Sequence, residues 1–459
     1  MHIPRKVPGG YGKPSPSGSE EEDLNSGQVS EQARRDRVFV EYAALIVWTL
    51  GTILVVLLGR GSVYAVAVST FGAVIAASLL IAWAAEASES SVSRGLALAI
   101  VAIVQTIPEY FIEGTIAWKA GSSPLQWLPN VVANFTGANR LLTGFGWPLI
   151  LLTLVVQKRR KADSGPTVIS LRREQSIEQV FMLGSSLYYV WILIEGRITI
   201  IDSVSLVAIF ALYVWMLARL PSLRDEPKEV LEGPSKSLAE IKTRSRKTAA
   251  IVGLFLFGGL SFLLITDSFV VSIQYLAQTF LEGLLGTGAV FFTIQWISPF
   301  LSEFPEKVTA FNWARQITLA PVALLNFISS AVNELTALVA LVPIVFVVSS
   351  GHLAPLPLDH QQLIEIFLTM AQSLYACAAL LDLSYDSQNA IILFSLWIIS
   401  TAVIETRFAV GVLFLVLAVY EILRNRRHII SFSAFRQTVS EGVLRRKPSS
   451  RTTEPTLAC

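Results

Sequence analysis

Runs of about twenty apolar residues recur along this chain and constrain its fold more than any other feature, because an α-helix of that length crosses the hydrocarbon core of a bilayer. Hydrophobic residues make up 53% of the 459 residues and charged residues only 15%, with a mean hydropathy of +0.57, which exceeds what a soluble domain carries. A transmembrane barrel would instead show short alternating strands. The sequence therefore predicts an all-α polytopic membrane protein.

Twelve spanning segments can be placed along the chain. They are expected at 38–58, 63–88, 95–117, 128–156, 177–195, 198–219, 249–281, 287–312, 317–348, 362–382, 388–404 and 407–423. Residues 1–36 are rich in Gly, Pro, Ser and acidic residues and show no apolar periodicity, so we expect a disordered tail. The first apolar run begins too late for a cleavable signal peptide of the usual kind.

Lysine and arginine predict the orientation of the chain. Segments on the side of the N-terminal tail collect most of them: Arg34, Arg35, Arg37, Lys158, Arg159, Arg160, Lys161, Arg172, Arg173, the basic loop 220–248, and Arg424, Arg426 and Arg427 in the tail 424–459. Segments on the other side collect only Arg60, Lys119, Arg197 and Arg407. Because basic loops stay in the cytoplasm, we expect a multi-pass protein of the cell (inner) membrane with both termini cytoplasmic.

Two Pro-Glu pairs lie deep inside apolar segments, Pro108-Glu109 and Pro305-Glu306. The basic loop divides the chain into halves, 63–219 and 249–404, and each half shows a long apolar helix, a Pro-Glu helix and an Asn-rich helix in that order. Five spans and a cytoplasmic loop separate equivalent helices, so the halves should cross the membrane in opposite directions, as in an inverted repeat. The segments 38–58 and 407–423 are extra helices at the two ends.

These elements resemble the sodium/calcium exchanger superfamily, the cation/calcium antiporters, and the chain is similar to a divergent prokaryotic-type member. The residues QTIPE at 105–109 and SEFPE at 302–306 look like the first motif of each of the family's repeats. The residues ANFTGA at 133–138 and LNFISS at 325–330, the latter reaching to Glu334, look like the second motif. The resemblance implies a secondary cation antiporter that works by alternating access.

The resemblance also implies ion ligands at Thr106, Glu109, Ser302, Glu306, Ser330 and Glu334. The metal-binding carboxylates among them would be Glu109, Glu306 and Glu334. Helical spacing places Glu113 on the face of Glu109 and Glu303 on the face of Glu306. Asn134, Asn139 and Asn326 are further candidates, although each of them, like Asn333, could equally serve as interhelical hydrogen-bond glue. The transported cations, Ca²⁺, Na⁺ or H⁺, would be the protein's inorganic partners, and we expect no other cofactor and no nucleic acid.

Two basic residues, Arg140 and Lys307, stand where apolar or small polar residues would be expected, and both are candidate internal counter-ions. An ungapped comparison of the halves sets Leu142 against Glu334, whereas a gap of one residue sets Arg140 against Glu334. With the gap, opposite charges would occupy equivalent positions. Arg140 would then take the place of a bound cation, because a guanidinium is effectively always protonated.

Two classes of function stay open. The first is an antiporter that exchanges Ca²⁺ or Na⁺ against Na⁺ or H⁺ at a carboxylate site near the midplane of the membrane. The second is a non-transporting membrane protein whose former ion site is an internal salt-bridge network. Ala138, Leu142 and Arg140 favour the second, since they remove polar groups or add a fixed charge. An enzyme is not expected, because no nucleotide loop, His cluster or nucleophile motif occurs.

Overall fold

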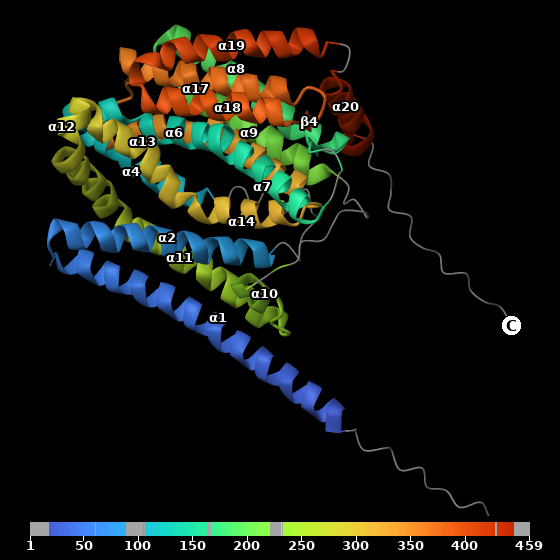
Figure 1. The fold of residues 1–459 in the computed structure, drawn as a ribbon. Helices are drawn as coiled ribbons and strands as arrows, with labels where there is room; N and C mark the ends of the chain where they lie inside the picture. The colour runs from blue at the N-terminus through green and yellow to red at the C-terminus, as the bar shows by residue number, and fades with distance from the viewer. Residues whose placement is uncertain are drawn as a thin grey trace, which may run out of the picture.

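The computed structural model describes residues 18–59, 61–88, 104, 106–162, 165, 167–220, 231, 233–426 and 429–444, with side chains from residue 36 onward except that of Thr287. Long helices lie side by side in one bundle (Figure 1), which confirms the predicted all-α class. In this described part, eight helical segments are long and apolar enough to cross a membrane. They are Asp36–Leu58, Val63–Ser88, Pro124–Arg160, Arg173–Glu195, Ile200–Arg219, Arg244–Leu285, Ala320–Ser350 and Ile404–Arg424.

The first half of the chain follows a leading helix, α1 (Gly18–Leu58). Its helices are α2 (Val63–Ser88), α4 (Ile107–Ser122), α5 (Pro124–Trp127), α6 (Ala133–Leu141), α7 (Trp147–Arg160), α8 (Ser176–Glu195) and α9 (Ile200–Arg219). α1 begins earlier than expected and takes in the second part of the segment 1–36, whose first 17 residues lie outside the described part. The beginning of the span expected at 95–117 also lies outside it.

The second half follows a short helix in the basic loop, α10 (Gly233–Ala239). Its helices are α11 (Arg244–Leu276), α12 (Glu282–Leu285), α13 (Ala289–Ser302), α14 (Phe304–Arg315), α15 (Ala320–Asn333), α16 (Val339–Ser350), α17 (His360–Ala379) and α18 (Ser387–Ala402). The extra C-terminal helix is α19 (Arg407–Arg424), and α20 (Ser431–Gln437) follows it.

Helix packing in the two halves is related by an inverted repeat. α4 packs on α16 as α14 packs on α7, and α6 packs on α17 as α15 packs on α8. The short strands follow the same rule: β1 (Ile169–Ser170) pairs with β4 (Ser384–Tyr385), and β2 (Arg197–Ile198) pairs with β3 (Leu356–Pro357), both antiparallel. Each sheet thus joins one half to the other, and the predicted inverted-repeat architecture is confirmed.

A pair of hydrogen bonds repeats the same relation at the level of side chains. The Tyr188 hydroxyl donates to Asp202 at 2.7 Å, and the Tyr375 hydroxyl donates to Asn389 at 2.8 Å. In both pairs the acceptor lies 14 residues after the tyrosine, on the following helix. The duplication therefore extends to a polar contact that our sequence comparison did not use.

Several spanning segments are broken near their middle. Pro305 lies at the start of α14 and Pro108 at the start of α4, and a proline in the first turn begins a helix because it has no N–H to donate backward. The Asn-rich segments are interrupted instead by π-helical turns, Leu142–Gly146 in the first half and Glu334–Leu338 in the second. The two turns begin at Leu142 and Glu334, the residues that the ungapped comparison of the halves pairs. The structure therefore supports that register and not the alternative with a gap.

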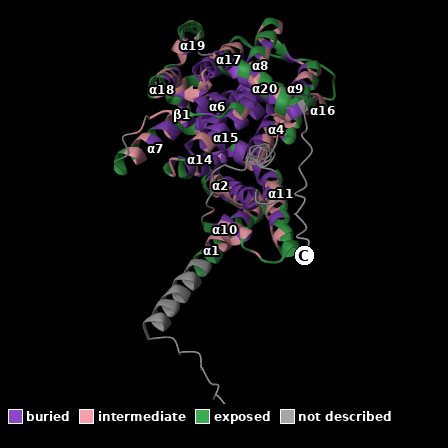
Figure 2. Ribbon diagram, turned by 90° about the vertical axis from the view of Figure 1, so that its right-hand side faces the viewer, coloured by how far each residue is buried: buried purple, intermediate pink, exposed green. Residues whose placement is uncertain are grey.

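The core of the bundle lies where the broken helices meet. Figure 2 shows buried residues concentrated around α4, α6, α14 and α15, while α1 and the outer faces of α9 and α11 carry many exposed residues. Every described residue of α6 is buried, including its polar and charged ones. A helix that is buried all round yet carries an arginine and two asparagines must satisfy those groups internally.

Candidate functional site

An acidic cluster lies at the start of α14, where the helix breaks place polar groups deep in the bundle. Its members are Glu109, Glu303, Glu306, Glu334 and Lys307, and none of these residues is more than 6% exposed. Glu109 interacts electrostatically with Glu303 and Glu306, and Glu334 interacts with all four of the other members. The cluster therefore gathers one carboxylate from the first half and three carboxylates and one ammonium from the second.

Helix geometry explains why these side chains converge. Glu109 and Glu306 each sit in the first turn of a helix that begins beside a proline, so both carboxylates lie near the positive end of a helix dipole. From there α4 runs toward the end of the bundle that holds α12, and α14 runs toward the end that holds α10 (Figure 1). Two half-helices that start near each other and point in opposite directions are expected from an inverted repeat.

Hydrogen bonds connect Glu306 to the Asn-rich helix of its own half. The Asn326 amide donates to Glu306 Oε1 at 3.0 Å, and the Ser330 hydroxyl donates to the same oxygen at 2.5 Å. Lys307 donates to Glu303 Oε2 one turn away on the same helix segment. The structure thus brings the candidates Asn326 and Ser330 to Glu306, and it pairs Lys307 with Glu303.

Several carboxylate oxygens in the cluster have no hydrogen-bond donor among the described residues. They are both oxygens of Glu109 and of Glu334, Glu303 Oε1 and Glu306 Oε2. Burying such an atom without a partner is costly, and an ionised carboxylate is costlier still. These oxygens are therefore free to accept a cation or a proton.

The candidate Thr106 is held at the rim of this cluster. Asn333 on α15 donates its amide N–H to the Thr106 hydroxyl, and the Tyr110 hydroxyl donates to Asn333 Oδ1 at 2.5 Å. These bonds join the first turn of α4 to the end of α15. Asn333 was weighed with the other asparagines as a ligand or as interhelical hydrogen-bond glue, and here it bonds between helices, whereas Tyr110 was not among our candidates.

Glu113, Asn134 and Ser302 form a neighbouring group on the α6 side. The Ser298 hydroxyl donates to Asn134 Oδ1 at 2.9 Å, and the Ser302 hydroxyl donates to the Ser298 carbonyl at 2.8 Å. Glu113 is fully buried beside Asn134. Ser302 also lies beside Glu109, so this group borders the acidic cluster without joining its charges.

Two predicted residues lie elsewhere. Asn139 accepts a hydrogen bond from Ser373 at 2.8 Å and donates to the Ala331 carbonyl at 3.5 Å, so it connects helices. Arg140, which we expected to neutralise the acidic cluster, is paired instead with Glu365, its Nη2 lying 2.8 Å from Glu365 Oε2. The register explains this difference, because Leu142 and not Arg140 is the counterpart of Glu334.

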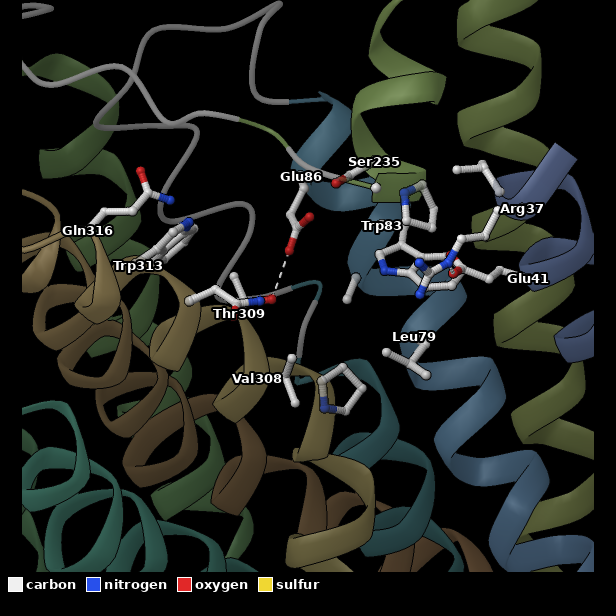
Figure 3. Close-up of a pocket in the computed structure, with 16 residues that line it drawn as sticks. Arg37, Glu41, Leu79, Trp83, Glu86, Ser235, Val308, Thr309, Trp313 and Gln316 are labelled. Carbon is white, nitrogen blue, oxygen red and sulfur yellow. Dashed lines mark hydrogen bonds and ion pairs between the residues drawn. The ribbon is translucent and has the colours of Figure 1, made fainter. Parts of the chain in front are cut away.

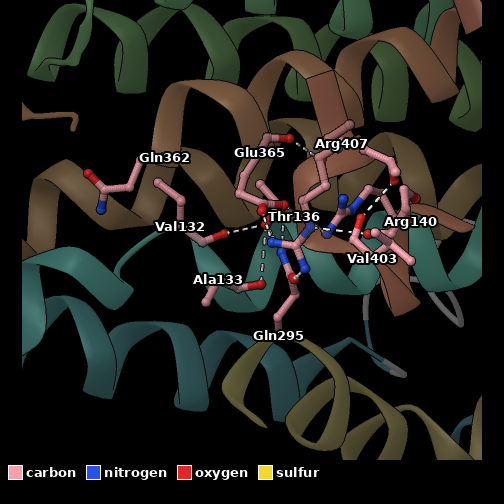
Figure 4. A network of polar contacts seen from close by, with 12 residues as sticks. Val132, Ala133, Thr136, Arg140, Gln295, Gln362, Glu365, Val403 and Arg407 are labelled. Carbon is pink, nitrogen blue, oxygen red and sulfur yellow. Dashed lines mark hydrogen bonds and ion pairs between the residues drawn. The ribbon is translucent and has the colours of Figure 1, made fainter. Parts of the chain in front are cut away.

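The partners of Arg140 form a second buried network, which we call the guanidinium network (Figure 4). Arg407 on α19 also pairs with Glu365, through the other carboxylate oxygen. Gln295 on α13 donates to Glu365 Oε2 at 2.8 Å and accepts from Arg407 at 3.1 Å, and Arg407 Nε donates to the Ser400 carbonyl at 3.1 Å. One carboxylate therefore serves two guanidinium groups, at a point where α6, α13, α17 and α19 meet.

Sequence reasoning missed most of this network. We counted Arg407 as a residue of an outside segment, but it is only 2% exposed and ion-paired. Glu365 lies near the start of an apolar helix, where a carboxylate is usually interpreted as a solvent-exposed residue at the helix end. The one available signal was that α17 carries Glu365, Thr369, Gln372 and Ser373 along one face at helical spacing.

The acidic cluster is not a preformed metal site in this conformation. Within the described ranges, no group of three or more His, Cys, Asp or Glu side chains is arranged to hold a metal ion. The ligand set of Glu109, Glu306 and Glu334 therefore stays a prediction. The unpartnered oxygens fit a transported cation by their chemistry, since oxygen is the ligand that Ca²⁺ and Na⁺ prefer.

Comparison with known proteins gives an independent view of this arrangement. The family profile described as "Sodium/calcium exchanger protein" matches residues 61–219. The crystal structure of the H⁺/Ca²⁺ exchanger CAX is 30% identical with a TM-score of 0.78, and the match covers 88% of this chain and 99% of that one. A structure of the sodium-calcium exchanger NCX_Mj is 16% identical with a TM-score of 0.48, covering 72% of this chain and 94% of that one. No curated protein sequence matches the chain.

The match to the H⁺/Ca²⁺ exchanger spans nearly the whole of that protein at 30% identity, and the family profile covers the first repeat of this chain, residues 61–219. The profile match takes in the Pro-Glu motif at 105–109 and the Asn-rich motif at 133–138. This chain therefore belongs to the sodium/calcium exchanger superfamily, the cation/calcium antiporters.

Proposed function

We propose that the protein is a secondary antiporter that exchanges Ca²⁺ against H⁺ at the acidic cluster, by alternating access between the two halves of the bundle. The observation that carries the proposal is the burial of four carboxylates with one ammonium where the broken helices of opposite orientation begin. On insertion scales each ionised group at the bilayer centre costs about 2.5–3.5 kcal/mol, so such a cluster persists only if cations or protons compensate its charge.

Calcium is the cargo that this set of groups suits best. Ca²⁺ takes six to eight oxygen ligands from carboxylates, amide carbonyls and water. The cluster offers carboxylate oxygens of Glu109, Glu306 and Glu334 that accept no hydrogen bond from the described residues, with the Ser330 hydroxyl and Asn326 amide beside them. Ca²⁺ would recruit these oxygens by a small closure of the broken helices.

Protons are the counter-cargo that the chemistry favours. When Ca²⁺ leaves, the carboxylates face one another in a low dielectric, and protonation is the least costly way to neutralise them. The relative with 30% identity is named an H⁺/Ca²⁺ exchanger, which supports the same choice. Competition between Ca²⁺ and H⁺ for Glu109, Glu306 and Glu334 would couple the two fluxes.

Lys307 sets how many charges the cargo must supply. Its ammonium is bonded to Glu303 within the cluster, so one carboxylate is neutralised in every state in which this pair persists. The cluster then needs fewer cations or protons than four free carboxylates would. Arg140 is not a member of this cluster, because it is paired with Glu365 in the guanidinium network.

The orientation we propose places the basic end of the bundle in the cytoplasm. The end of α7, which carries Arg160, lies at the same end of the bundle as α10 and α20 (Figure 1). Arg244 at the start of α11 and Arg424 at the end of α19 follow the same rule. Basic residues are retained on the cytoplasmic side, so both termini would face the cytoplasm of the cell in which this membrane lies.

Ion flux in proteoliposomes tests the proposal. The purified protein is reconstituted with a Ca²⁺ indicator and a pH indicator inside, and Ca²⁺, Na⁺ and pH gradients are imposed one at a time. We expect Ca²⁺ uptake driven by an outward H⁺ gradient, with internal pH rising as Ca²⁺ enters. Uptake that follows a Na⁺ gradient and ignores pH would overturn the choice of counter-cargo.

A non-transporting protein is the second candidate, and the two buried ion-pair systems favour it. Lys307–Glu303 and the guanidinium network are internal salt bridges of the kind that a retired ion site would leave. That reading predicts no flux under any of the gradients above, in a protein that is inserted and folded.

A further inference from the structure

Two cavities at the basic end of the bundle differ in the ligands that they suit. The one between α1, α2, α10 and α14 is lined by charged, polar and aromatic side chains, among them Glu86 and Thr309 (Figure 3). The other, of about 440 Å³, lies between α8, α17, α19 and α20, and aliphatic side chains supply most of its lining. We call this second cavity the apolar groove. The proposed exchange at the acidic cluster does not use it.

Two helices supply the long walls of the apolar groove. Each wall is a set of three side chains at helical spacing: Val180, Leu183 and Leu187 on α8, and Leu415, Val419 and Ile422 on α19. At 1.5 Å per residue, each set extends over about 10 Å of helix. Leu187 and Val419 are both about half exposed, so the groove opens on the flank of the bundle that faces the bilayer. An apolar cavity of about 150 Å³ already takes up benzene, so the groove has room for much of an acyl chain.

An exposed arginine lies where the groove meets the basic end of the bundle. The chain leaves the groove lining at Ile422, ends α19 at Arg424 and returns to the lining at Ile429. Arg424 is paired with Glu421, its Nη1 lying 3.4 Å from Oε1, so its charge is compensated. Arg426 lies two residues further along the same connection and is exposed, and no carboxylate in the described part of the chain forms an ion pair with it.

The short helix α20 brings a second arginine to the same end. Phe432 lines the groove, and Arg436 follows it by four residues on this helix, so the two side chains share a face. Arg436 is exposed and, like Arg426, has no ion-pair partner among the described carboxylates. The Ser431 hydroxyl donates to Gln179 Oε1 at 2.6 Å, which fastens α20 to α8 at the groove. The groove therefore ends beside two guanidinium groups whose charge the described residues leave uncompensated.

We propose that the apolar groove binds one acyl chain of an anionic phospholipid of the bilayer, whose phosphate group is held by Arg426 and Arg436. The acyl chain matches the apolar walls and enters from the flank without leaving the hydrocarbon core. Guanidinium groups bind phosphate oxygens through paired N–H donors, and basic sites between transmembrane helices bind anionic headgroups. Because α19 and α20 lie outside the duplicated halves, the lipid fastens these added helices to α8 and α17.

Native mass spectrometry of the full-length protein tests the headgroup site. The protein is titrated in mild detergent with phosphatidylglycerol and phosphatidylcholine that carry the same acyl chains. We expect phosphatidylglycerol to bind more tightly, and its affinity to fall about fivefold for each arginine removed in Arg426→Gln/Arg436→Gln. Arg244→Gln/Arg246→Gln removes an equal charge from exposed positions at the start of α11 and should leave the affinity unchanged. Equal affinity for the two lipids, or equal losses in the two double variants, would overturn the proposal.

Variants of the walls test the place of the acyl chain. Ala378 and Ala418 both line the groove, so Ala378→Leu/Ala418→Leu should fill part of it and lower the affinity for phosphatidylglycerol at least threefold with both arginines intact. Ala208→Leu/Ala211→Leu adds the same volume to the exposed face of α9 and should change nothing. Leu187→Gln, at an exposed position of the wall, should also weaken binding without filling the groove. Unchanged affinity in folded Leu187→Gln and Ala378→Leu/Ala418→Leu proteins would show that the lipid lies elsewhere.

Thermal unfolding separates the lipid from its headgroup. A ligand that binds only the folded protein raises the Tm, so phosphatidylglycerol should raise it more than phosphatidylcholine does. Glycerophosphoglycerol, the same headgroup without acyl chains, should give no rise. An equal rise with this soluble headgroup would mean that the arginines hold a phosphate ester without the groove, which would overturn the proposal. None of these measurements depends on ion exchange, so their results stand whichever cations the protein moves.

Discussion

Removing Glu365 should destabilise the protein far more than removing either arginine beside it. Within the described ranges, Glu365 carries the only carboxylate paired with Arg140 and Arg407, and all three side chains are no more than 2% exposed. Glu365→Gln keeps the shape of the side chain but leaves two buried guanidinium groups without a counter-charge. Arg407→Met leaves Arg140 and Glu365 as a neutral pair.

The size of the difference follows from these charges. Leaving one buried charge uncompensated costs about 3–5 kcal/mol. Glu365→Gln raises the net formal charge of the three side chains from +1 to +2, so we expect a loss within that range. Arg407→Met loses the hydrogen bonds of Arg407 to Gln295 and Ser400 but leaves no net charge. Its cost should be about 1–3 kcal/mol.

Equilibrium unfolding in mixed detergent micelles, followed by circular dichroism, measures both losses. The double variant Glu365→Gln/Arg407→Met should be more stable than the sum of the single effects predicts, since it retains one unpaired guanidinium and not two. Arg424→Met is the control. Arg424 is the last residue of the same helix, its side chain is 45% exposed, and its loss should cost less than about 1 kcal/mol. An Arg407→Met protein as unstable as Glu365→Gln, or strictly additive effects, would refute the charge argument.

Three further outcomes are expected. Lys307→Gln should lower the KM for Ca²⁺ in vesicle transport about tenfold, because it removes the repulsion between the ammonium and the bound ion. A tenfold effect is a modest share of the ~4 kcal/mol between unit charges 4 Å apart at an effective dielectric of 20. An unchanged KM would show that Lys307 does not act on the bound ion. Gly137→Ala should reduce folded yield in detergent, because the added Cβ would lie 1.8 Å from the Gln295 carbonyl oxygen; normal yield would mean that α6 and α13 separate easily. Asn326→Ala should reduce Ca²⁺ flux at unchanged thermal stability, whereas Asn139→Ala should reduce thermal stability at unchanged KM; the reverse pattern would mean that the roles assigned to these two amides are exchanged.

The sequence predicted those parts of the site that are marked by local signals. Proline and glutamate side by side in an apolar run indicate a broken helix with a buried charge, wherever the rest of the chain packs. Glu109 and Glu306 were found on that basis, and the structure brings both into one cluster. Lys307 was singled out in the same way, as a charge in an apolar run, and the structure pairs it with Glu303 one turn away.

The parts that sequence reasoning missed depend on packing between distant segments. Arg140 meets Glu365 only because α6 packs on α17, and Arg407 reaches the same carboxylate only because α19 packs on α17. In a sequence, an arginine at the first residue of a helix is interpreted as a loop residue, because nothing there indicates that a neighbouring helix will cover it. The register of the Asn-rich segments was likewise decided by the π-helical turns, which no residue pattern indicated.

The central claim is that Ca²⁺ and H⁺ compete for the carboxylates of the acidic cluster. The most direct test measures Ca²⁺ uptake and internal pH together in proteoliposomes that contain the unmodified protein, Glu109→Gln or Glu306→Gln. Glu240→Gln is the matched control, because it removes an equal charge from an exposed position next to α10. We predict coupled Ca²⁺ and H⁺ movement in the unmodified and control proteins, and loss of both fluxes together in each cluster variant that remains folded. Near-normal coupled flux in Glu109→Gln and Glu306→Gln would contradict the claim.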